Sequence, residues 1–237
     1  MSSKPVLRLD WCSHAAAKYA VEHWHYSRRM PAGKMVRIGV WENERFIGCV
    51  LFGRGANNNI GKAYGLDQTE VCELVRVALG DHVCAVSRIG SIAIRMLRSL
   101  APRLRLLVSY ADPAHGHHGG IYQAMGWVYS GVSEGTHQIV LPNGQRMHKR
   151  SARAKYGTND AALLGGVWVY PEQKHKYIYP LDDAMREQIA PLAKPYPKRP
   201  RAERIGSDAP GDHPGEGGAV PTSALQDDSR ATTAEVA

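Results

Sequence analysis

Apolar and polar positions along this chain change period several times, and each period predicts a different element. From 89 to 100, apolar residues recur every three or four positions, which is one face of an amphipathic helix. The apolar runs 35–41 and 46–52 are separated by four polar residues and predict a hairpin. The stretches 71–79 and 104–110 predict strands on either side of the helix in the sequence.

Weaker patterns complete the body of the chain. An Ala-rich segment at 13–23 predicts a short helix with Ser13 as its N-cap. Further elements are expected as a short helix at 120–125 and as strands at 127–130, 136–141, 167–170 and 176–179. Strands and helices in this order indicate an α+β domain with a mixed central sheet flanked by helices.

The periodic pattern ends near position 190, which sets the expected domain boundaries. Residues 1–190 form the predicted folded domain. Residues 191–205 are rich in Pro, Lys and Arg and predict a basic linker, or alternatively a tether for DNA. Residues 206–237 contain mainly Gly, Pro, Ser, Asp and Thr, so they bury too little apolar surface to offset chain entropy. We expect this acidic tail to be disordered.

Charge is divided unevenly between these parts. Residues 206–237 hold one arginine and six acidic residues, whereas residues 1–205 hold 29 basic and 16 acidic residues, a net charge of +13. A basic body favours a polyanionic partner, because phosphates attract Lys and Arg and release counterions on binding. A basic surface that only confers solubility is the alternative.

Other features narrow the class of protein. No segment is apolar over the length of a membrane span, and the first ten residues hold no signal-peptide core. A cytoplasmic protein without a membrane partner is therefore expected. The four cysteines show no CxxC spacing, which favours small buried thiols over a zinc ribbon.

Most of the side chains suited to chemistry lie in the segment 107–131. A predicted strand runs into a polar turn and then into a short helix, which together carry Asp112, His115, His117, His118 and Tyr122. In open α/β sheets, ligands bind beyond the carboxyl ends of the strands. Asp112 is suited to cap a turn, to bind a metal or to accept a proton. The histidines are suited to bind a metal or a DNA phosphate.

Arg76 lies in an otherwise apolar strand and needs an anionic partner, because an unpaired buried charge is costly. Glu70, Asp112 and a substrate carboxylate or phosphate are the partners that stay open. Glu73 is expected on the opposite face of the same strand, since three positions separate the two residues. Ser87 precedes the periodic helix and is expected to be its N-cap.

Five segments resemble known proteins: 23–34, 39–61, 64–79, 86–100 and 108–127. HWHYSRRMPAGK and VSYADPAHGHHGGIYQAMGW, the first and last of them, closely resemble the phage Mom family of DNA-modification proteins. The last also resembles the second half of an acetyltransferase-like (GNAT) domain. The resemblance implies a GNAT-like fold for residues 1–190, in which two central parallel strands splay apart and the donor substrate enters the gap.

The same resemblance implies an enzyme. It would be a transferase that converts adenine in double-stranded DNA to N6-carbamoylmethyladenine and so protects phage DNA from host restriction. Its partners would be double-stranded DNA and a small-molecule donor. Because adenine N6 lies within the base stack, such an enzyme is expected to flip the base or to act at a distorted site.

The resemblance also implies roles for particular residues. The catalytic set would be His25, Asp112, Tyr122 and Arg76, with His25 as a ligand or general base and Tyr122 as general acid. The family's R/Q-x-x-G-x-G/A loop is reduced here to Arg88-Ile89-Gly90-Ser91, so donor contacts are expected from Ser87, Arg88 and Gly90. The expected DNA contacts are Tyr26, Arg28, Arg29, Lys34, Arg54 and Lys62.

The donor stays open at this point. An ordinary acyl transfer would give N6–CO–R, whereas a glycyl group on N6 is an isomer of carbamoylmethyl. An acyl-coenzyme A or an activated glycine, followed by rearrangement, is one hypothesis. Iron held by His25, Asp112 and His117 is another.

Two other functions also stay open. One is a GNAT acyltransferase that uses a coenzyme A thioester on a protein or a small amine. The other is a non-catalytic DNA-binding module, which would explain the charge but not the cluster of Asp112, His and Tyr122.

Overall fold

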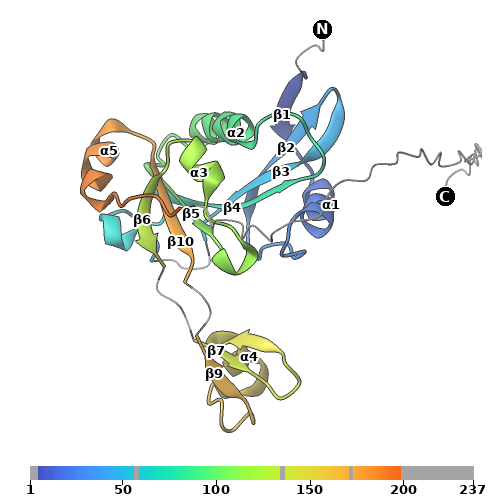
Figure 1. Ribbon diagram of the computed structural model, residues 1–237, viewed down its shortest axis with the longest axis vertical. Coiled ribbons are helices and arrows are strands. Elements are labelled where there is room, and N and C mark those ends of the chain that lie inside the picture. The colour runs from blue at the N-terminus through green and yellow to red at the C-terminus, as the bar shows by residue number, and fades with distance from the viewer. Residues whose placement is uncertain (1–4, 56–58, 134–136, 171–172, 199–237) are drawn as a thin grey trace, which may run out of the picture. The chain divides into compact units, whose positions relative to one another are not determined.

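The computed structural model describes residues 5–55, 59–133, 137–170 and 173–198, and a seven-stranded sheet forms its centre (Figure 1). The strand order is β1-β2-β3-β4-β5-β10-β6. In that order the strands are Leu7–Trp11, Met35–Glu42, Arg45–Gly53, Val71–Leu79, Leu106–Ala111, His175–Pro180 and Val128–Val132. Only β4 and β5 run parallel, so the sheet is mixed, as the sequence predicts.

Helices cover both faces of this sheet. Side chains of successive strand residues point to opposite faces, so apolar residues on both faces need a helix to pack against. On β5, Leu107 packs in the cluster that contains α2 (Val86–Leu100) and α3 (Gly120–Ala124), whereas Leu106 packs against α5 (Asp183–Ile189). Helix α1 (His14–Trp24) packs through Ala17, Ala20 and Val21 on β3 and β4. Short 3-10 turns are η1 (Lys62–Tyr64), η2 (Pro113–His115) and η3 (Ala190–Leu192).

The parallel strands β4 and β5 separate soon after they begin. Their register covers three pairs, Val71 with Leu106, Cys72 with Leu107 and Glu73 with Val108. At the next residues a side chain replaces the ladder, since the Ser109 hydroxyl oxygen lies 2.7 Å from the Leu74 carbonyl oxygen. This divergence confirms the splayed parallel strands expected of a GNAT-like fold.

A second, three-stranded sheet lies between β6 and β10 in the sequence. Its order is β8-β7-β9, with β7 at Gln138–Val140, β8 at Arg146–His148 and β9 at Val167–Val169, and it carries helix α4 (Lys149–Tyr156). It has its own core of Ile139, Leu141, Met147, Ala152 and Ala161. The strands expected at 136–141 and 167–170 therefore belong to this sheet and not to the central one.

Two sequence expectations hold in detail, the N-cap of α1 and the burial of most cysteine thiols. The Ser13 hydroxyl accepts a hydrogen bond from the Ala16 N–H at 3.1 Å and caps α1. All four cysteines are free thiols, and Cys49, Cys72 and Cys84 are buried. No helix in the described ranges is long and apolar enough to cross a membrane.

The strand expected at 176–179 is confirmed as β10, which lies between β5 and β6 with Tyr177 and Ile178 fully buried. The described part of the expected linker, 191–198, packs on the sheet: the Lys194 N–H donates to the Tyr129 carbonyl at 2.8 Å, and the Tyr196 hydroxyl donates to the Trp127 carbonyl at 2.7 Å. The tail expected at 206–237 lies outside the described residues.

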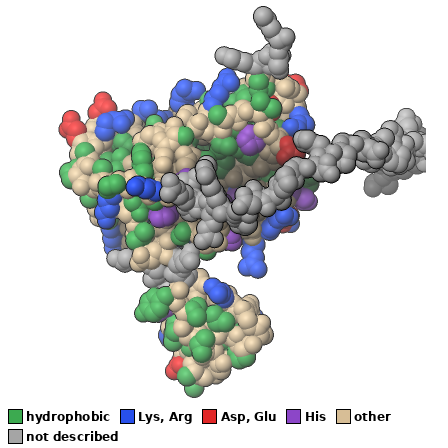
Figure 2. All heavy atoms as spheres, in the orientation of Figure 1, with side chains coloured by type: hydrophobic (Ala, Val, Ile, Leu, Met, Phe, Trp, Pro, Cys, Tyr) green, Lys and Arg blue, Asp and Glu red, His purple; other side chains and the backbone are tan. Residues whose placement is uncertain are grey.

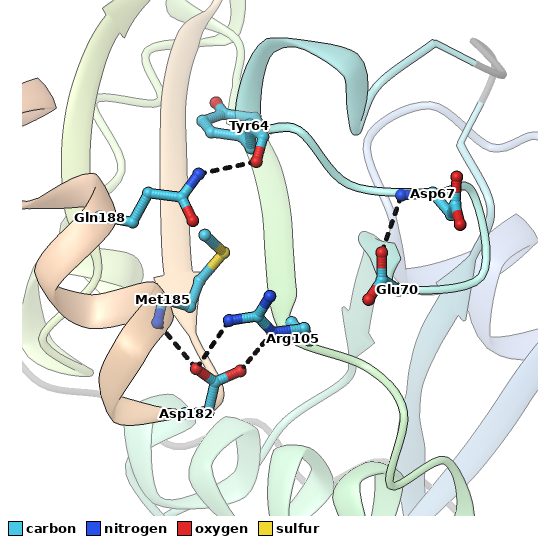
Figure 3. A network of polar contacts seen from close by, with 7 residues as sticks. All are labelled: Tyr64, Asp67, Glu70, Arg105, Asp182, Met185 and Gln188. Carbon is cyan, nitrogen blue, oxygen red and sulfur yellow. Dashed lines mark hydrogen bonds and ion pairs between the residues drawn. The ribbon is translucent and has the colours of Figure 1, made fainter.

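A polar network joins α5 to the start of β5 (Figure 3). Asp182 caps α5 by accepting the Met185 N–H at 2.7 Å, and its carboxylate also accepts the Arg105 Nε–H at 2.9 Å. The Gln188 amide of the same helix donates to the Tyr64 carbonyl at 2.7 Å. These bonds hold α5 at the amino end of β5, away from the end where the polar turn begins.

We expect Asp182→Ala to lower the free energy of unfolding by about 1 kcal/mol, because the helix loses its N-cap. Asp182→Asn keeps a capping oxygen and should lose much less. Urea unfolding of the two variants beside the wild type measures this difference, and equal losses would contradict the capping role.

Candidate functional site

A cavity of about 680 Å³ opens where β4 and β5 diverge. Its walls come from the end of α1, the outer half of β4, the end of β5, the turn 116–120 and α3. The cavity therefore lies at the strand ends, where the sequence predicts ligand binding. The visible face of the main body carries more basic than acidic side chains (Figure 2).

A β-bulge at Val75 decides which side chains of β4 face the cavity. Leu51 of β3 pairs with Arg76, and Phe52 pairs with Leu74, so Val75 is the extra residue. One extra residue reverses the alternation of faces. Glu73 and Arg76 therefore share a face and both line the cavity, which corrects the expectation that they face opposite sides.

Arg76 brings a guanidinium group into the cavity wall. Its Nη1 donates to the Val75 carbonyl at 2.8 Å, while its buried Nε has no hydrogen-bond partner among the described residues. The two carboxylates offered by the sequence interact elsewhere: Glu70 accepts the Asp67 N–H at 2.9 Å, and Asp112 pairs with Lys174. The free N–H of Arg76 is thus suited to an oxygen of a bound molecule.

His25 follows α1 as its C-cap and is 8% exposed. Its Nδ1 accepts the Ser27 N–H at 3.1 Å and lies 2.8 Å from the Ser27 hydroxyl oxygen. Because a backbone N–H can only donate, Nδ1 carries no proton and the neutral ring is protonated at Nε2. Burial, and then the nearby charges of Arg76, His117 and His115, lower the pKa of His25 to about 4. The ring is therefore neutral at pH 7 and offers a donor.

An aromatic cluster adjoins His25. The ring of Tyr26 lies 4.3 Å from that of His25, 4.4 Å from that of His115 and 4.9 Å from that of His117, measured between centroids. Tyr26 and His117 line the cavity, and Tyr26 is 41% exposed. This cluster joins the segment 23–34 to the turn after β5, two segments that the sequence singled out separately.

Asp112 lies beside the cavity and not in its lining. It caps η2 by accepting the Ala114 N–H at 3.2 Å, and Lys174 Nζ lies 2.9 Å from its other oxygen. Burial raises the pKa of Asp112, but the hydrogen bond and charge of Lys174 outweigh burial and hold the pKa below its usual value. Lys174 itself lines the cavity. Lys174 could not be predicted from local sequence, because 62 positions separate it from Asp112.

Tyr122 closes the inner end of the cavity. Its hydroxyl oxygen lies 2.7 Å from the Ser109 hydroxyl oxygen, which also lies 2.7 Å from the Leu74 carbonyl. Because the carbonyl can only accept, Ser109 donates to Leu74 and Tyr122 donates to Ser109. Burial raises the pKa of Tyr122 to about 12. Sequence analysis missed Ser109, a single hydroxyl within an apolar run.

The start of α2 does not form the expected donor cradle. The carboxylate of Glu42, which is buried, accepts the N–H groups of Val83 (3.0 Å) and Cys84 (2.7 Å), and these bonds lower the pKa of Glu42. Ser87 is the second residue of α2 and not its N-cap, which is Ala85. The predicted cap is wrong because the helix begins two residues earlier than Ser87 as N-cap would require.

Gly90 and Arg88 also differ from a pyrophosphate loop. A Cβ on Gly90 would lie 2.4 Å from Met125 Sδ, so this glycine allows α3 to pack closely on α2. Arg88 is exposed and does not line the cavity. Glu42 occupies two amides of the loop before α2, and neither Arg88 nor Gly90 lines the cavity, so the segment 88–91 does not form the expected pyrophosphate loop.

The set His25, Asp112 and His117 does not fit a metal either. Among the described residues, no group of three or more His, Cys, Asp or Glu side chains could hold a metal ion. Nδ1 of His25 is taken by the Ser27 N–H, and the Asp112 carboxylate by Lys174 and Ala114. We therefore derive no step through iron.

The expected DNA contacts are spread over the surface. The cations Arg28, Arg29, Lys34, Arg54 and Lys62 are all exposed, and none lines the cavity. Arg28 has a positive φ of 49° and donates from Nη1 to the Glu22 carbonyl at 3.2 Å. Of the expected set, only Tyr26 is brought to the cavity itself.

The mixed sheet, the diverging parallel strands and the cavity between them define a GNAT-like fold. A model of the Mom protein family matches residues 6–198, so the chain belongs to the Mom protein family. The chain is 26% identical over 208 residues to the methylcarbamoylase mom of Escherichia phage Mu, which covers 81% of this chain and 84% of that protein.

Solved structures of low sequence identity are also similar. One is FeeM, an N-acyl amino acid synthase from uncultured soil microbes, with a TM-score of 0.45 and 11% identity over 78% of this chain and 94% of that one. Another is the aminoglycoside acetyltransferase AAC(6')-Ib, with a TM-score of 0.40 and 12% identity over 65% of this chain and 100% of that one.

The neutral state of His25 predicts a pH dependence of stability. A pKa lowered from 6.5 to about 4 means that the unfolded chain binds the proton first, so stability is complete above pH 6.5 and falls as the pH drops toward 4. Between pH 7 and pH 5 we expect His25 to contribute a loss of about 2 kcal/mol.

Urea unfolding of wild type and His25→Gln at both pH values measures this term, because the variant lacks the titrating ring. An identical pH dependence in the two proteins would show that His25 titrates normally.

Glu42 occupies the amides of Val83 and Cys84 before α2, and we therefore expect no saturable binding of coenzyme A in the micromolar range, as measured by calorimetry.

Glu42→Ala should lower the melting temperature, because the amides of Val83 and Cys84 lose their hydrogen-bond partner. Glu44→Ala, an exposed neighbour, is the control and should not. Tight binding of coenzyme A by the wild type would contradict this account.

Proposed function

We propose that this chain transfers a carbamoylmethyl group to N6 of adenine in double-stranded DNA. Membership of the Mom family and the methylcarbamoylase of phage Mu support the reaction type. The observation that carries the proposal is the convergence of Glu73, Arg76 and His25 on one cavity at the strand ends. In the cytoplasm of an infected cell, the product would protect phage DNA from restriction endonucleases.

The target adenine would leave the base stack to reach this cavity. A volume of about 680 Å³ falls in the range of small-molecule sites and has room for a purine ring together with a small donor. Tyr26 and His117 offer ring faces on which a flipped base can stack. The exposed cations Arg28 and Arg29 lie two and three positions after Tyr26 in the sequence. They are suited to contact the DNA phosphates next to the flipped base.

The donor would be held by hydrogen-bond donors at the cavity wall. The unpartnered Nε–H of Arg76 and the Nε2–H of neutral His25 both suit a carboxylate or carbonyl oxygen. Ser87, Arg88 and Gly90 do not supply such groups at the cavity. A small donor such as an activated glycine fits this arrangement better than coenzyme A. Its glycyl group would first be joined to N6 through the carbonyl carbon while the activating group leaves, and this isomer would then rearrange to carbamoylmethyl.

The amine N6 must lose a proton as its new N–C bond forms and the leaving group departs with its bonding electrons. Glu73 is the one carboxylate among the described residues that line the cavity, so we assign the proton to it. His25 already carries its proton at Nε2, and Asp112 is paired with Lys174 outside the lining. Asp112 thus becomes a positioning residue for Lys174, and Tyr122 a positioning residue for Ser109.

Glu73→Gln should lower the yield of modified adenine at least about 100-fold while DNA binding persists, because the variant keeps the shape but cannot take the proton. Asp112→Asn should cause a smaller loss, since a neutral amide can still contact Lys174. Mass spectrometry of nucleosides from plasmid DNA of cells that express each variant measures both effects. Full activity of Glu73→Gln, with none in Asp112→Asn, would return the role of base to Asp112.

The same experiment distinguishes the alternatives. An acyltransferase acting on a protein or a small amine would bind coenzyme A and leave adenine unmodified. A non-catalytic module would bind duplex DNA with unmodified adenosine in cells that express the wild type.

A further inference from the structure

The connection between β6 and β10 is much longer than the sheet requires. These strands are antiparallel neighbours, which a turn of a few residues can join, yet positions 133–174 lie between them. The core of the inserted sheet, with Ile139 and Met147 at its centre, contributes to none of the three clusters of the main sheet. The insertion is thus not needed for the main core.

The insertion carries a dense group of cations. Within ten positions of β8 and α4 the chain places five exposed basic residues and no acidic one: Arg146, Lys149, Arg150, Arg153 and Lys155. None of them forms an ion pair with another described residue. Such a group repels itself, and a polyanion relieves that repulsion.

Helical geometry arranges three of these cations in one row. Ala152 is the buried residue of α4, so this side of the helix faces the small core. At 100° per residue, Lys149, Arg150 and Arg153 fall within a single 100° arc that excludes Ala152. Lys149 and Arg153 are one turn apart, about 6 Å along the axis. Arg146 lies on the edge strand β8 that leads into the helix.

We propose that α4 and β8 form a binding site for the phosphate backbone of duplex DNA, separate from the catalytic cavity. This inference rests on the proposed function. Among the described residues, the cavity lining holds only Arg76 and Lys174 as permanent cations, which is too few for a duplex backbone. The insertion also ends at Lys174, which pairs with Asp112 and lines the cavity. The chain segment that would bind the duplex is thus joined directly to a residue of the cavity.

The test compares two triple variants of the full chain. Lys149→Gln/Arg150→Gln/Arg153→Gln removes the row of cations. Arg95→Gln/Arg98→Gln/Arg103→Gln removes the same charge from exposed positions on and after α2 that do not line the cavity. Fluorescence anisotropy with a short duplex of mixed sequence is measured over a range of salt concentrations, and thermal melting confirms that both variants fold.

We expect the α4 variant to bind the duplex at least tenfold more weakly at low salt. Its slope of log affinity against log salt should fall by roughly 0.9 for each phosphate contact removed. The control triple should keep the slope and affinity of the wild type. The yield of N6-modified adenine should fall with affinity for the α4 variant alone.

Three results would overturn the inference. Equal affinity and slope in both triples would show that α4 does not contact phosphate. Loss of binding to single-stranded RNA but not to duplex DNA would make the surface an RNA site. If the wild type neither binds duplex DNA nor modifies adenine, the proposed function itself fails and the inference with it.

Discussion

The ladder between β4 and β5 ends after Glu73 and Val108, and the rest of the site depends on that ending. Two parallel strands that separate leave backbone groups without their regular partners, which is costly in a buried sheet. The Ser109 hydroxyl supplies the missing donor to the Leu74 carbonyl and takes a hydrogen bond from Tyr122. The bulge at Val75 then turns Arg76 to the side of Glu73. The interrupted ladder between β4 and β5 thus creates the cavity, and the bulge between β3 and β4 gives it a charged wall.

The charge and protonation state of each group in this wall depend on its neighbours. Arg76 disfavours a second positive charge nearby, and burial acts in the same direction, so His25 stays neutral. The Ser27 N–H fixes the tautomer and leaves a donor on the other ring nitrogen. Lys174 is compensated by Asp112. The cavity therefore presents donors toward an incoming oxygen, and Glu73 is the carboxylate that lines it among the described residues.

Local periodicity is enough to predict the helix face at 89–100, although not that the helix begins at Val86. It also predicts the hairpin of β2 and β3 and the strand-turn-helix block around Asp112. It could not predict contacts that join distant positions, such as Lys174 with Asp112 or Glu42 with the Cys84 amide. Nor could it detect β1, an edge strand of only five residues, or the bulge at Val75 that reverses the facing of Arg76. Candidate site residues can be proposed from the sequence by type and position, whereas their hydrogen-bond and ion-pair partners require the fold.

The carboxylate of Glu42 occupies part of the loop before α2, next to the end of the helix where a GNAT-like fold is expected to bind its donor. A helix N-terminus beside two diverging strands attracts anions whether they come from a ligand or from the protein. In this chain a buried carboxylate of β2 already holds the amides of Val83 and Cys84, and Gly90 serves the packing of Met125. These two amides are therefore not available to a phosphate group of a donor. The cavity wall offers a different donor group, since the buried Nε–H of Arg76 has no described partner. A GNAT-like sheet can in this way keep the gap between its strands while a carboxylate of the protein occupies part of the loop before the helix.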